Sequence, residues 1–154
     1  MDNYIYILNV RFAGDIHFSK KVECDVENVR VPSMILQPVV ENAVNHGIRN
    51  IDWEGHIDLS VERWNDHIEI SVRDNGLGMT GEQIQRVLSK KVHSSSGEGD
   101  STGIGMNNVI SRLELYYERD GLMEIYSEGE GMGTEVVINI PLERSEKNVQ
   151  NPDC

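Results

Sequence analysis

A predicted helix over residues 33–48 carries the sequence Leu36-Gln37-Pro38-Val39-Val40-Glu41-Asn42-Ala43-Val44-Asn45-His46-Gly47. At 100° per residue, its apolar residues gather on one side and its short polar residues on the other. A merely solvated face favours Lys and longer Glu, so short amide and carboxylate groups indicate a site. Pro38 inside the helix removes one hydrogen bond and predicts a bend near the first turn. The apolar side holds Leu36, Val39, Val40, Ala43, Val44 and Gly47, and the polar side holds Glu41, Asn42, Asn45 and Arg49, with His46 at its edge.

Strands and helices are predicted on both sides of this helix. Residues 57–61 and 68–72 alternate apolar and polar side chains, which predicts a hairpin with its turn at 63–67. Thr80-Gly81-Glu82-Gln83 matches a capping box and starts another helix. This order predicts an α+β fold, a two-layer α/β sandwich in which helices cover one face of a mixed sheet. Before this helix, the sequence predicts a helix within 4–12 and a strand at 16–23. After it come an irregular loop at 90–102 and a hairpin of strands at 123–127 and 134–140. Between that loop and that hairpin, Gly103-Ile104-Gly105 opens a predicted helix whose inward-facing residues are Met106, Val109, Ile110, Leu113 and Tyr117.

The composition is that of one domain and excludes several classes of protein. The 154 residues are 38% apolar, enough for a core, and carry a net charge of -12. Nucleic acid is an unexpected partner because binding to phosphate backbones needs a basic patch. Two distant cysteines give no disulfide framework, and no apolar run approaches the roughly 18 residues of a membrane span. The composition is cytosolic in character.

Three polar patches are candidates for chemistry, and each has an ordinary structural alternative. Asn42 offers an amide oxygen of the kind that suits Mg²⁺, although Glu41, Asn42, Asn45 and His46 are also compatible with a plain polar helix face. Asp74-Asn75-Gly76-Leu77-Gly78 reads as a turn, but its two glycines let a flat ring approach the backbone. A buried carboxylate there accepts a hydrogen bond from the amino group of adenine and repels the carbonyl oxygen of guanine.

The third patch is Gly103-Ile104-Gly105 at a predicted helix start, where free N–H groups and the helix dipole suit phosphates. A simple helix-entry turn explains the same residues. Asn108 occupies the place of the third glycine of the dinucleotide fingerprint, and the chain has no Gly-x-x-x-x-Gly-Lys phosphate loop.

Taken in order, these motifs resemble the catalytic ATP-binding domain of sensor histidine kinases, in the group that includes gyrase, Hsp90 and the mismatch-repair ATPase MutL. The 36–47 segment resembles the group's N box. Asp74-x-Gly76-x-Gly78, Gly103-x-Gly105-Met106-x-Asn108 and Gly131-Met132-Gly133-Thr134 resemble its later motifs. The Leu-Gln-Pro…Glu-Asn-Ala form with Asn107-Asn108-Val109-Ile110-Ser111-Arg112-Leu113 is most similar to the subfamily of the YesM and LytS sensors. The resemblance implies the Bergerat type of sandwich.

The resemblance also implies roles for matching residues, with ATP and Mg²⁺ as ligands. Asn42 is the implied Mg²⁺ ligand, Asp74 the residue that recognises adenine, and Glu41 a catalytic residue that polarises a water or the incoming nucleophile. Two others, Lys91 and His93, lie in or near an implied lid at 79–102, and whether they contact phosphate stays open. The implied binding residues are Asn42, Asn45, His46, Asp74, Gly76, Gly78, Met79, Gly103, Ile104, Gly105, Met106 and Thr134.

Two departures from the family pattern carry expectations. Pro38 replaces the acid of gyrase-like members, so independent ATP hydrolysis is expected to be feeble. None of the five histidines lies in a setting like the phospho-acceptor, which in the subfamily is on an upstream helix.

Residues 1–14 are therefore expected to be the truncated end of a dimerisation helix region, 15–143 the catalytic domain and 144–154 a disordered tail. The expected whole protein is a membrane-attached homodimer with this domain in the cytoplasm. Its expected partners are its own phospho-acceptor segment and a response regulator. Two alternatives stay open: a serine/threonine kinase-type regulator of the same fold, or a non-catalytic nucleotide-binding or partner-interaction module.

Overall fold

A computed structural model describes residues 16–26, 29–32, 34–89 and 101–142, without the side chains of residues 24 and 101–104. Within these residues a five-stranded sheet has the order β1-β2-β3-β5-β4. The strands are β1 (Ile16–Val22), β2 (Gly55–Arg63), β3 (His67–Asp74), β4 (Met123–Tyr126) and β5 (Thr134–Pro141). β1 runs parallel to β2, and the other neighbours are antiparallel.

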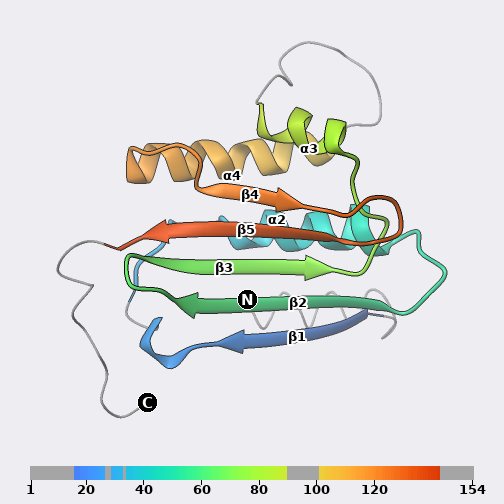
Figure 1. The fold of residues 1–154 in the computed structure, drawn as a ribbon, viewed down its shortest axis with the longest axis horizontal. Coiled ribbons are helices and arrows are strands. Elements are labelled where there is room, and N and C mark those ends of the chain that lie inside the picture. The colour runs from blue at the N-terminus through green and yellow to red at the C-terminus, as the bar shows by residue number, and fades with distance from the viewer. Residues whose placement is uncertain (1–15, 27–28, 33, 90–100, 143–154) are drawn as a thin grey trace.

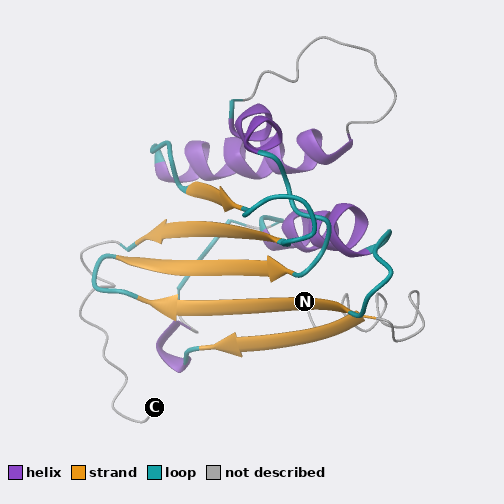
Figure 2. Ribbon diagram, turned by 45° about the vertical axis from the view of Figure 1, so that its right-hand side comes forward, coloured by secondary structure: helices purple, strands orange, loops and turns teal. Residues whose placement is uncertain are grey.

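The helices form the second layer, on one face of the sheet (Figures 1 and 2). They are α2 (Leu36–Asn42), which continues as the π-helix η2 (Ala43–Ile48), α3 (Gly81–Leu88) and α4 (Ser101–Tyr117). A short 3₁₀ helix, η1 (Cys24–Val26), follows β1. The core lies between the layers and includes the nearly inaccessible side chains of Val40, Val72, Leu113 and Ile138. The predicted mixed sheet covered by helices is confirmed.

The predicted central hairpin has the expected pairing. Leu59 lies opposite Val72, and Val61 lies opposite Ile70. The turn is shorter than predicted because β2 continues through Arg63 and β3 begins at His67. The backbone N–H of Trp64 donates to the backbone carbonyl of His67 at 2.9 Å, which closes the turn.

The predicted helix over 33–48 is wrong in two details. It begins at Leu36, so Pro38 is its third residue. The N–H groups of the first turn have no partner inside a helix, and proline there removes no hydrogen bond. The predicted bend therefore lacks its cause. The second half is a π-helix, in which Ile48 is buried, and Leu36 at the start of α2 is only half-buried.

The helix expected to open at Gly103 instead begins at Ser101, so residues 101 and 102 belong to α4 and not to the loop. Packing of the rest of this helix outweighs the poor helix propensity of glycine. Its predicted inward residues are confirmed: Met106, Val109, Ile110 and Leu113 are buried, and Tyr117 packs against the core. The predictions for residues 1–14 and 144–154, and for Lys91 and His93, lie outside the described residues.

Candidate functional site

Asp74 is a buried carboxylate at the end of β3. Its carboxylate accepts a hydrogen bond from the backbone N–H of Gly76 at 2.9 Å and another from the N–H of Thr134, which faces Asp74 across the sheet. Burial raises the pKa of Asp74 to about 6, because desolvation outweighs the two hydrogen bonds that favour the ionised form. The carboxylate keeps acceptor capacity for a ligand beyond these two donors.

Close backbone approach places the helix η2 directly on this carboxylate. A Cβ on Gly47 would lie 2.7 Å from Asp74 Oδ1, and a Cβ on Gly76 would lie 2.1 Å from the carbonyl oxygen of Gly47. That same oxygen accepts a hydrogen bond from Leu77 at 2.9 Å. Only glycine at positions 47 and 76 lets the helix and the loop meet so closely.

The loop after β4 closes the site from the other side. Gly131 donates its N–H to the carbonyl of Leu77 at 2.7 Å, and Gly133 donates to that of Gly76 at 3.1 Å. Ser127 Oγ donates to the carbonyl of Gly133 at 2.6 Å and accepts from the N–H of Met79 at 3.0 Å. Ser127 therefore links two loops that are about 50 residues apart in sequence.

Asn75 supports the site from behind. Its side chain accepts a hydrogen bond from the N–H of His56 at 2.7 Å and donates to the carbonyl of Glu54 at 2.8 Å. The indole N–H of Trp53 donates to the carbonyl of Asn75 at 2.8 Å. The residue next to Asp74 is thus held by the segment that leads into β2, which limits how the carboxylate can move.

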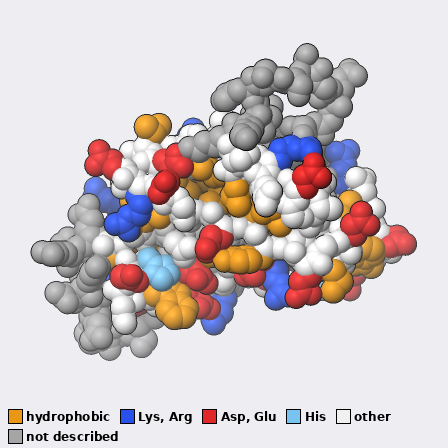
Figure 3. Space-filling view, turned by 45° about the horizontal axis from the view of Figure 1, so that its top comes forward, with side chains coloured by type: hydrophobic (Ala, Val, Ile, Leu, Met, Phe, Trp, Pro, Cys, Tyr) orange, Lys and Arg blue, Asp and Glu red, His pale blue; other side chains and the backbone are white. Residues whose placement is uncertain are grey.

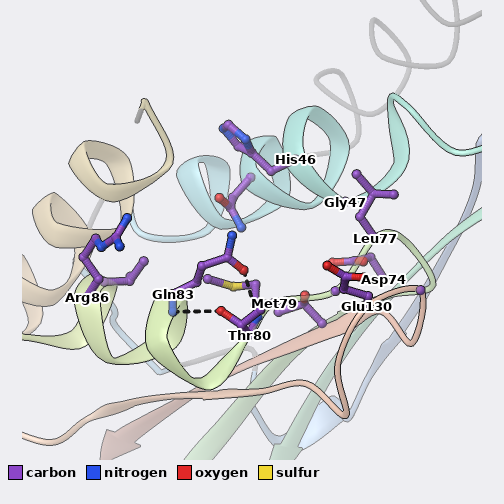
Figure 4. Close-up of a pocket in the computed structure, with 14 residues that line it drawn as sticks. His46, Gly47, Asp74, Leu77, Met79, Thr80, Gln83, Arg86 and Glu130 are labelled. Carbon is purple, nitrogen blue, oxygen red and sulfur yellow. Dashed lines mark hydrogen bonds between the residues drawn. The ribbon is translucent and has the colours of Figure 1, made fainter. Parts of the chain in front are cut away.

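These elements enclose a cavity of about 430 Å³. A second cavity of about 210 Å³ adjoins it, and the two share Asn42 and His46. Figure 4 shows Asp74 and Glu130 at one end of the larger cavity and Arg86 at the other. The larger cavity is lined by Asn42, His46, Gly47, Asp74, Leu77, Gly78, Met79, Thr80, Gln83, Arg86, Val87, Glu130, Gly131 and Thr134. The smaller one is lined by Pro38, Glu41, Asn42, Asn45, His46, Gly105 and Met106.

Asn42 has an unusual environment at the junction of the two cavities. Its Oδ1 atom is buried and has no hydrogen-bond partner in the described part of the chain. An unsatisfied buried oxygen costs about 1–3 kcal/mol, so its retention points to a ligand that binds there. One turn earlier, Gln37 Nε2 donates to Glu41 Oε1 at 3.1 Å and orients that carboxylate.

Most of the residues selected from the sequence come together here. Ten of them line one cavity or the other, although they come from α2, η2, β3, β5, α4 and the loops between. Gly76 lines neither cavity and instead makes the close contact with Gly47. The side chain of Ile104 lies outside the description, as does any contact at Gly103. Because α4 begins at Ser101, Gly105 is its fifth residue, and its N–H is no longer among those left free at the helix start.

Sequence reasoning missed the contribution of α3. Gln83, Arg86 and Val87 line the cavity and follow the i, i+3, i+4 spacing of one helix face. That spacing is the sequence signal for a shared helix face, whereas the capping box predicts only where the helix starts. Gly131, which also lines this cavity, belongs to the predicted Gly131–Thr134 motif. The other lining residues of the larger cavity outside the predicted set are Gly47, Leu77, Thr80 and Glu130.

Residues 31–144 match the family of histidine kinase-, DNA gyrase B- and HSP90-like ATPases. The chain belongs to this ATPase family. The family predicted from the motifs is therefore confirmed, and nucleotide binding is the property that membership implies.

Relatives of this ATPase domain are sensor histidine kinases. The sensor histidine kinase YpdA of Escherichia coli (strain K12) is 31% identical over 150 residues, which cover 93% of this chain and 23% of YpdA. The sensor histidine kinase/phosphatase LytS of Staphylococcus aureus (strain MRSA252) is 30% identical over 145 residues, covering 94% of this chain and 24% of LytS. The chain thus spans roughly a quarter of the length of these curated relatives.

Solved structures support the fold of the ATPase domain. The catalytic domain of histidine kinase ThkA superposes with a TM-score of 0.64 at 18% identity, covering 90% of both chains. The mycobacterial sensor histidine kinase MprB superposes with a TM-score of 0.63 at 20% identity, covering 91% of this chain and 90% of that one. Among the helices in the described ranges, none combines the length and apolar character needed to span a bilayer.

Proposed function

We propose that this ATPase domain binds Mg²⁺-ATP and supplies the γ-phosphate to a histidine on an upstream helical segment of a sensor kinase. The observation that carries the proposal is one cleft with a buried carboxylate, Asp74, at one end and, further along, an oxygen of Asn42 that has no hydrogen-bond partner among the described residues. The first group matches the edge of a base, and the second matches a metal bound to phosphates. The kinase names of the relatives add support.

Asp74 recognises adenine in this proposal. Its carboxylate accepts a hydrogen bond from the exocyclic amino group, whereas guanine presents a carbonyl oxygen that the carboxylate repels. Thr134, which lies opposite Asp74 on β5, lines the cleft together with Gly78 and Met79. A buried acceptor discriminates strongly because a ligand without the donor leaves it unpaired.

Asn42 fits a magnesium ion. Mg²⁺ prefers oxygen ligands, keeps several waters and binds through few protein groups plus the phosphates. The Oδ1 of Asn42, buried and without a partner in the part of the chain that the structure describes, is a neutral oxygen of this kind. When bound, the ion supplies positive charge that offsets the negative charge of the triphosphate.

The smaller cavity receives the phosphate end. Glu41 lines it together with Asn45 and Gly105, and His46 lies between the two cavities. In this proposal the carboxylate of Glu41, which accepts a hydrogen bond from Gln37, polarises the attacking group. Gly103, Ile104 and Met106 complete the proposed binding set from α4.

The whole protein in this proposal is a membrane-attached homodimer that passes the phosphoryl group on to a response regulator. The domain lies on the cytoplasmic side, where ATP is available.

The proposed transfer is tested by mixing this chain, γ-labelled ATP and Mg²⁺ with the separately prepared upstream helical segment. An acid-labile, base-stable label on a histidine of that segment is the expected result. An acid-stable label on serine or threonine, in this segment or in an added partner protein, indicates the alternative kinase class. ATP binding without transfer, or failure to bind ATP, indicates a non-catalytic module.

Replacing Asn42 with alanine is expected to lower the affinity for Mg²⁺-ATP by roughly 10- to 100-fold, since one charge-assisted contact is worth about 1.5–3 kcal/mol. The affinity of Asn42→Ala for adenosine is expected to stay within about twofold of the parent. Calorimetric titrations with both ligands, with and without Mg²⁺, measure the difference. Asn65→Ala, in the exposed turn between β2 and β3, is the matched control.

Stability provides the check on folding for this variant. Asn42→Ala removes a buried oxygen without a partner among the described residues, so the ligand-free variant is expected to be at least as stable as the parent. Equal losses of Mg²⁺-ATP and adenosine binding contradict the metal role of Asn42.

A further inference from the structure

Helix α3 presents one basic side chain to the cleft. Arg86 lines the cavity beside Val87, which is buried with 6% of its surface exposed. The helix is fixed at its start, where Thr80 Oγ1 accepts from the N–H of Gln83 at 3.2 Å and Gln83 Oε1 accepts from the N–H of Thr80 at 2.8 Å. The capping box and the buried valine together determine where the guanidinium of Arg86 can reach.

The position of Arg86 along the cleft assigns it to one end. In Figure 4 it lies at the opposite end from Asp74 and Glu130, on the far side of Gln83. Both charged groups at the Asp74 end are carboxylates. If the base occupies the Asp74 end, the rest of the nucleotide extends toward Asn42, His46 and Arg86. The cation therefore lies where a phosphate chain passes.

The charge of the molecule makes this cation important. The chain carries a net charge of -12, and Figure 3 shows acidic side chains spread over the face that it displays. A polyphosphate is repelled by such a surface unless a local cation offsets the charge. Arg86 is the permanently charged cation among the described residues that line the larger cavity.

The contact between Arg86 and Glu82 on its own helix does not prevent this role. Arg86 Nη2 lies 3.4 Å from Glu82 Oε1, in an i, i+4 pair whose side chains are 52% and 84% exposed. An exposed pair of this kind is worth little and exchanges readily for a phosphate oxygen. Guanidinium and phosphate form stronger, often bidentate, charge-assisted hydrogen bonds.

We infer that Arg86 contacts the phosphate chain of the bound nucleotide and makes the cleft prefer adenine nucleotides over adenosine. The inference rests on the proposed function, because it takes the base to bind at Asp74. Arg86 acts here as a binding residue for the part of the phosphate chain that lies in the larger cavity, before the chain reaches the smaller one. Neither the metal at Asn42 nor the transfer step depends on it.

The test compares adenosine, ADP and ATP as ligands of the parent chain and of Arg86→Gln, with Mg²⁺ and at fixed salt. Arg86→Gln is expected to bind ATP and ADP about tenfold more weakly and adenosine within about twofold of the parent. Arg86→Lys keeps the charge but not the planar set of donors, so its affinity for ATP and ADP is expected to lie between those of the parent chain and of Arg86→Gln. Arg73→Gln, an exposed position on β3 outside the cavity, is the control with the same change in net charge.

The outcomes separate the inference from the function on which it rests. Equal loss for adenosine and ATP in Arg86→Gln, or the same loss of ATP affinity in Arg73→Gln, overturns the role of Arg86 and leaves the proposed function standing. If the parent chain binds neither adenosine nor ATP, the proposed function fails first. Selective loss of the phosphorylated ligands in Arg86→Gln alone supports the inference.

Discussion

Replacing Asp74 with asparagine is expected to lower the affinity for adenosine and for ATP by about 100-fold or more, while the domain remains folded. The amide presents a donor where the carboxylate presented an acceptor, so the amino group of adenine meets a second donor. Calorimetry with adenosine gives the cleanest measurement because this ligand has no phosphate that titrates. Unchanged adenosine affinity in Asp74→Asn contradicts the assignment of the base to this end of the cleft.

Because the pKa of Asp74 is raised, the substitution Asp74→Asn is expected to stabilise the fold even though it weakens binding. Its pKa rises from 3.8 in the ordinary state to about 6 in the fold, so between these pH values the folded chain holds a proton that the unfolded chain has released. The contribution of Asp74 to the free energy of unfolding therefore falls as pH rises from about 4 to 6, and stays lowered above pH 6. The amide resembles the protonated acid and avoids this cost.

Asp74→Asn is accordingly expected to be more stable than the parent at pH 7.5, by up to about 3 kcal/mol at 1.36 kcal/mol per pKa unit. No gain is expected at pH 4. Urea unfolding at both values measures the difference. Parent affinity for adenosine is expected to decline as pH falls through about 6, because the ionised acceptor is lost. Loss of binding together with loss of stability at pH 7.5 would indicate a damaged fold instead.

Replacing Gly76 with alanine is expected to destabilise the domain by about 3 kcal/mol or more, one of the larger effects available to a single methyl group. The added Cβ would lie 2.1 Å from the carbonyl oxygen and 2.2 Å from the carbonyl carbon of Gly47. Both are backbone atoms, so no side-chain rotation relieves the overlap and η2 must move away from β3. Thermal and urea unfolding measure the loss.

Gly81→Ala is the matched control for that substitution. Nothing lies within 4 Å of a Cβ at Gly81, the first residue of α3, and alanine favours the helix by up to about 1 kcal/mol. Its midpoint of thermal unfolding is expected to stay level or rise. A Gly76→Ala variant as stable as Gly81→Ala would show that the contact between η2 and the Asp74 loop is looser than the structure has it.

The elements of the fold could be predicted from the sequence because each has a short-range signal. Alternation in 57–61 and 68–72 gave the hairpin with its pairing of Leu59 and Val72, and the capping box gave the start of α3. Where the signal was ambiguous, the prediction failed. A helical period cannot distinguish an α-helix from the π-helix of η2, since one extra residue per turn alters the phase only after several residues.

The candidate site was predictable only in part. Asn42 and Asp74, which both line the cavity, could be selected because the chemistry of each is visible in its own motif. Arg86 and Ser127 were not, because their importance comes from segments that meet them in space: α3 over the cavity, and the loop after β4 against Met79. Neither residue has a local pattern that distinguishes it from an ordinary helical arginine or a turn serine.

By itself the sequence determined the order of elements and the family, and it made Asn42 and Asp74 candidate binding residues, since period, capping and motif spacing are local properties. The tertiary structure alone decided that Gly47 lies against the carboxylate of Asp74, that this burial raises its pKa and that the oxygen of Asn42 has no partner in the described chain. The reason is physical: desolvation and unsatisfied hydrogen bonding depend on which atoms surround a group, and these atoms come from distant parts of the chain.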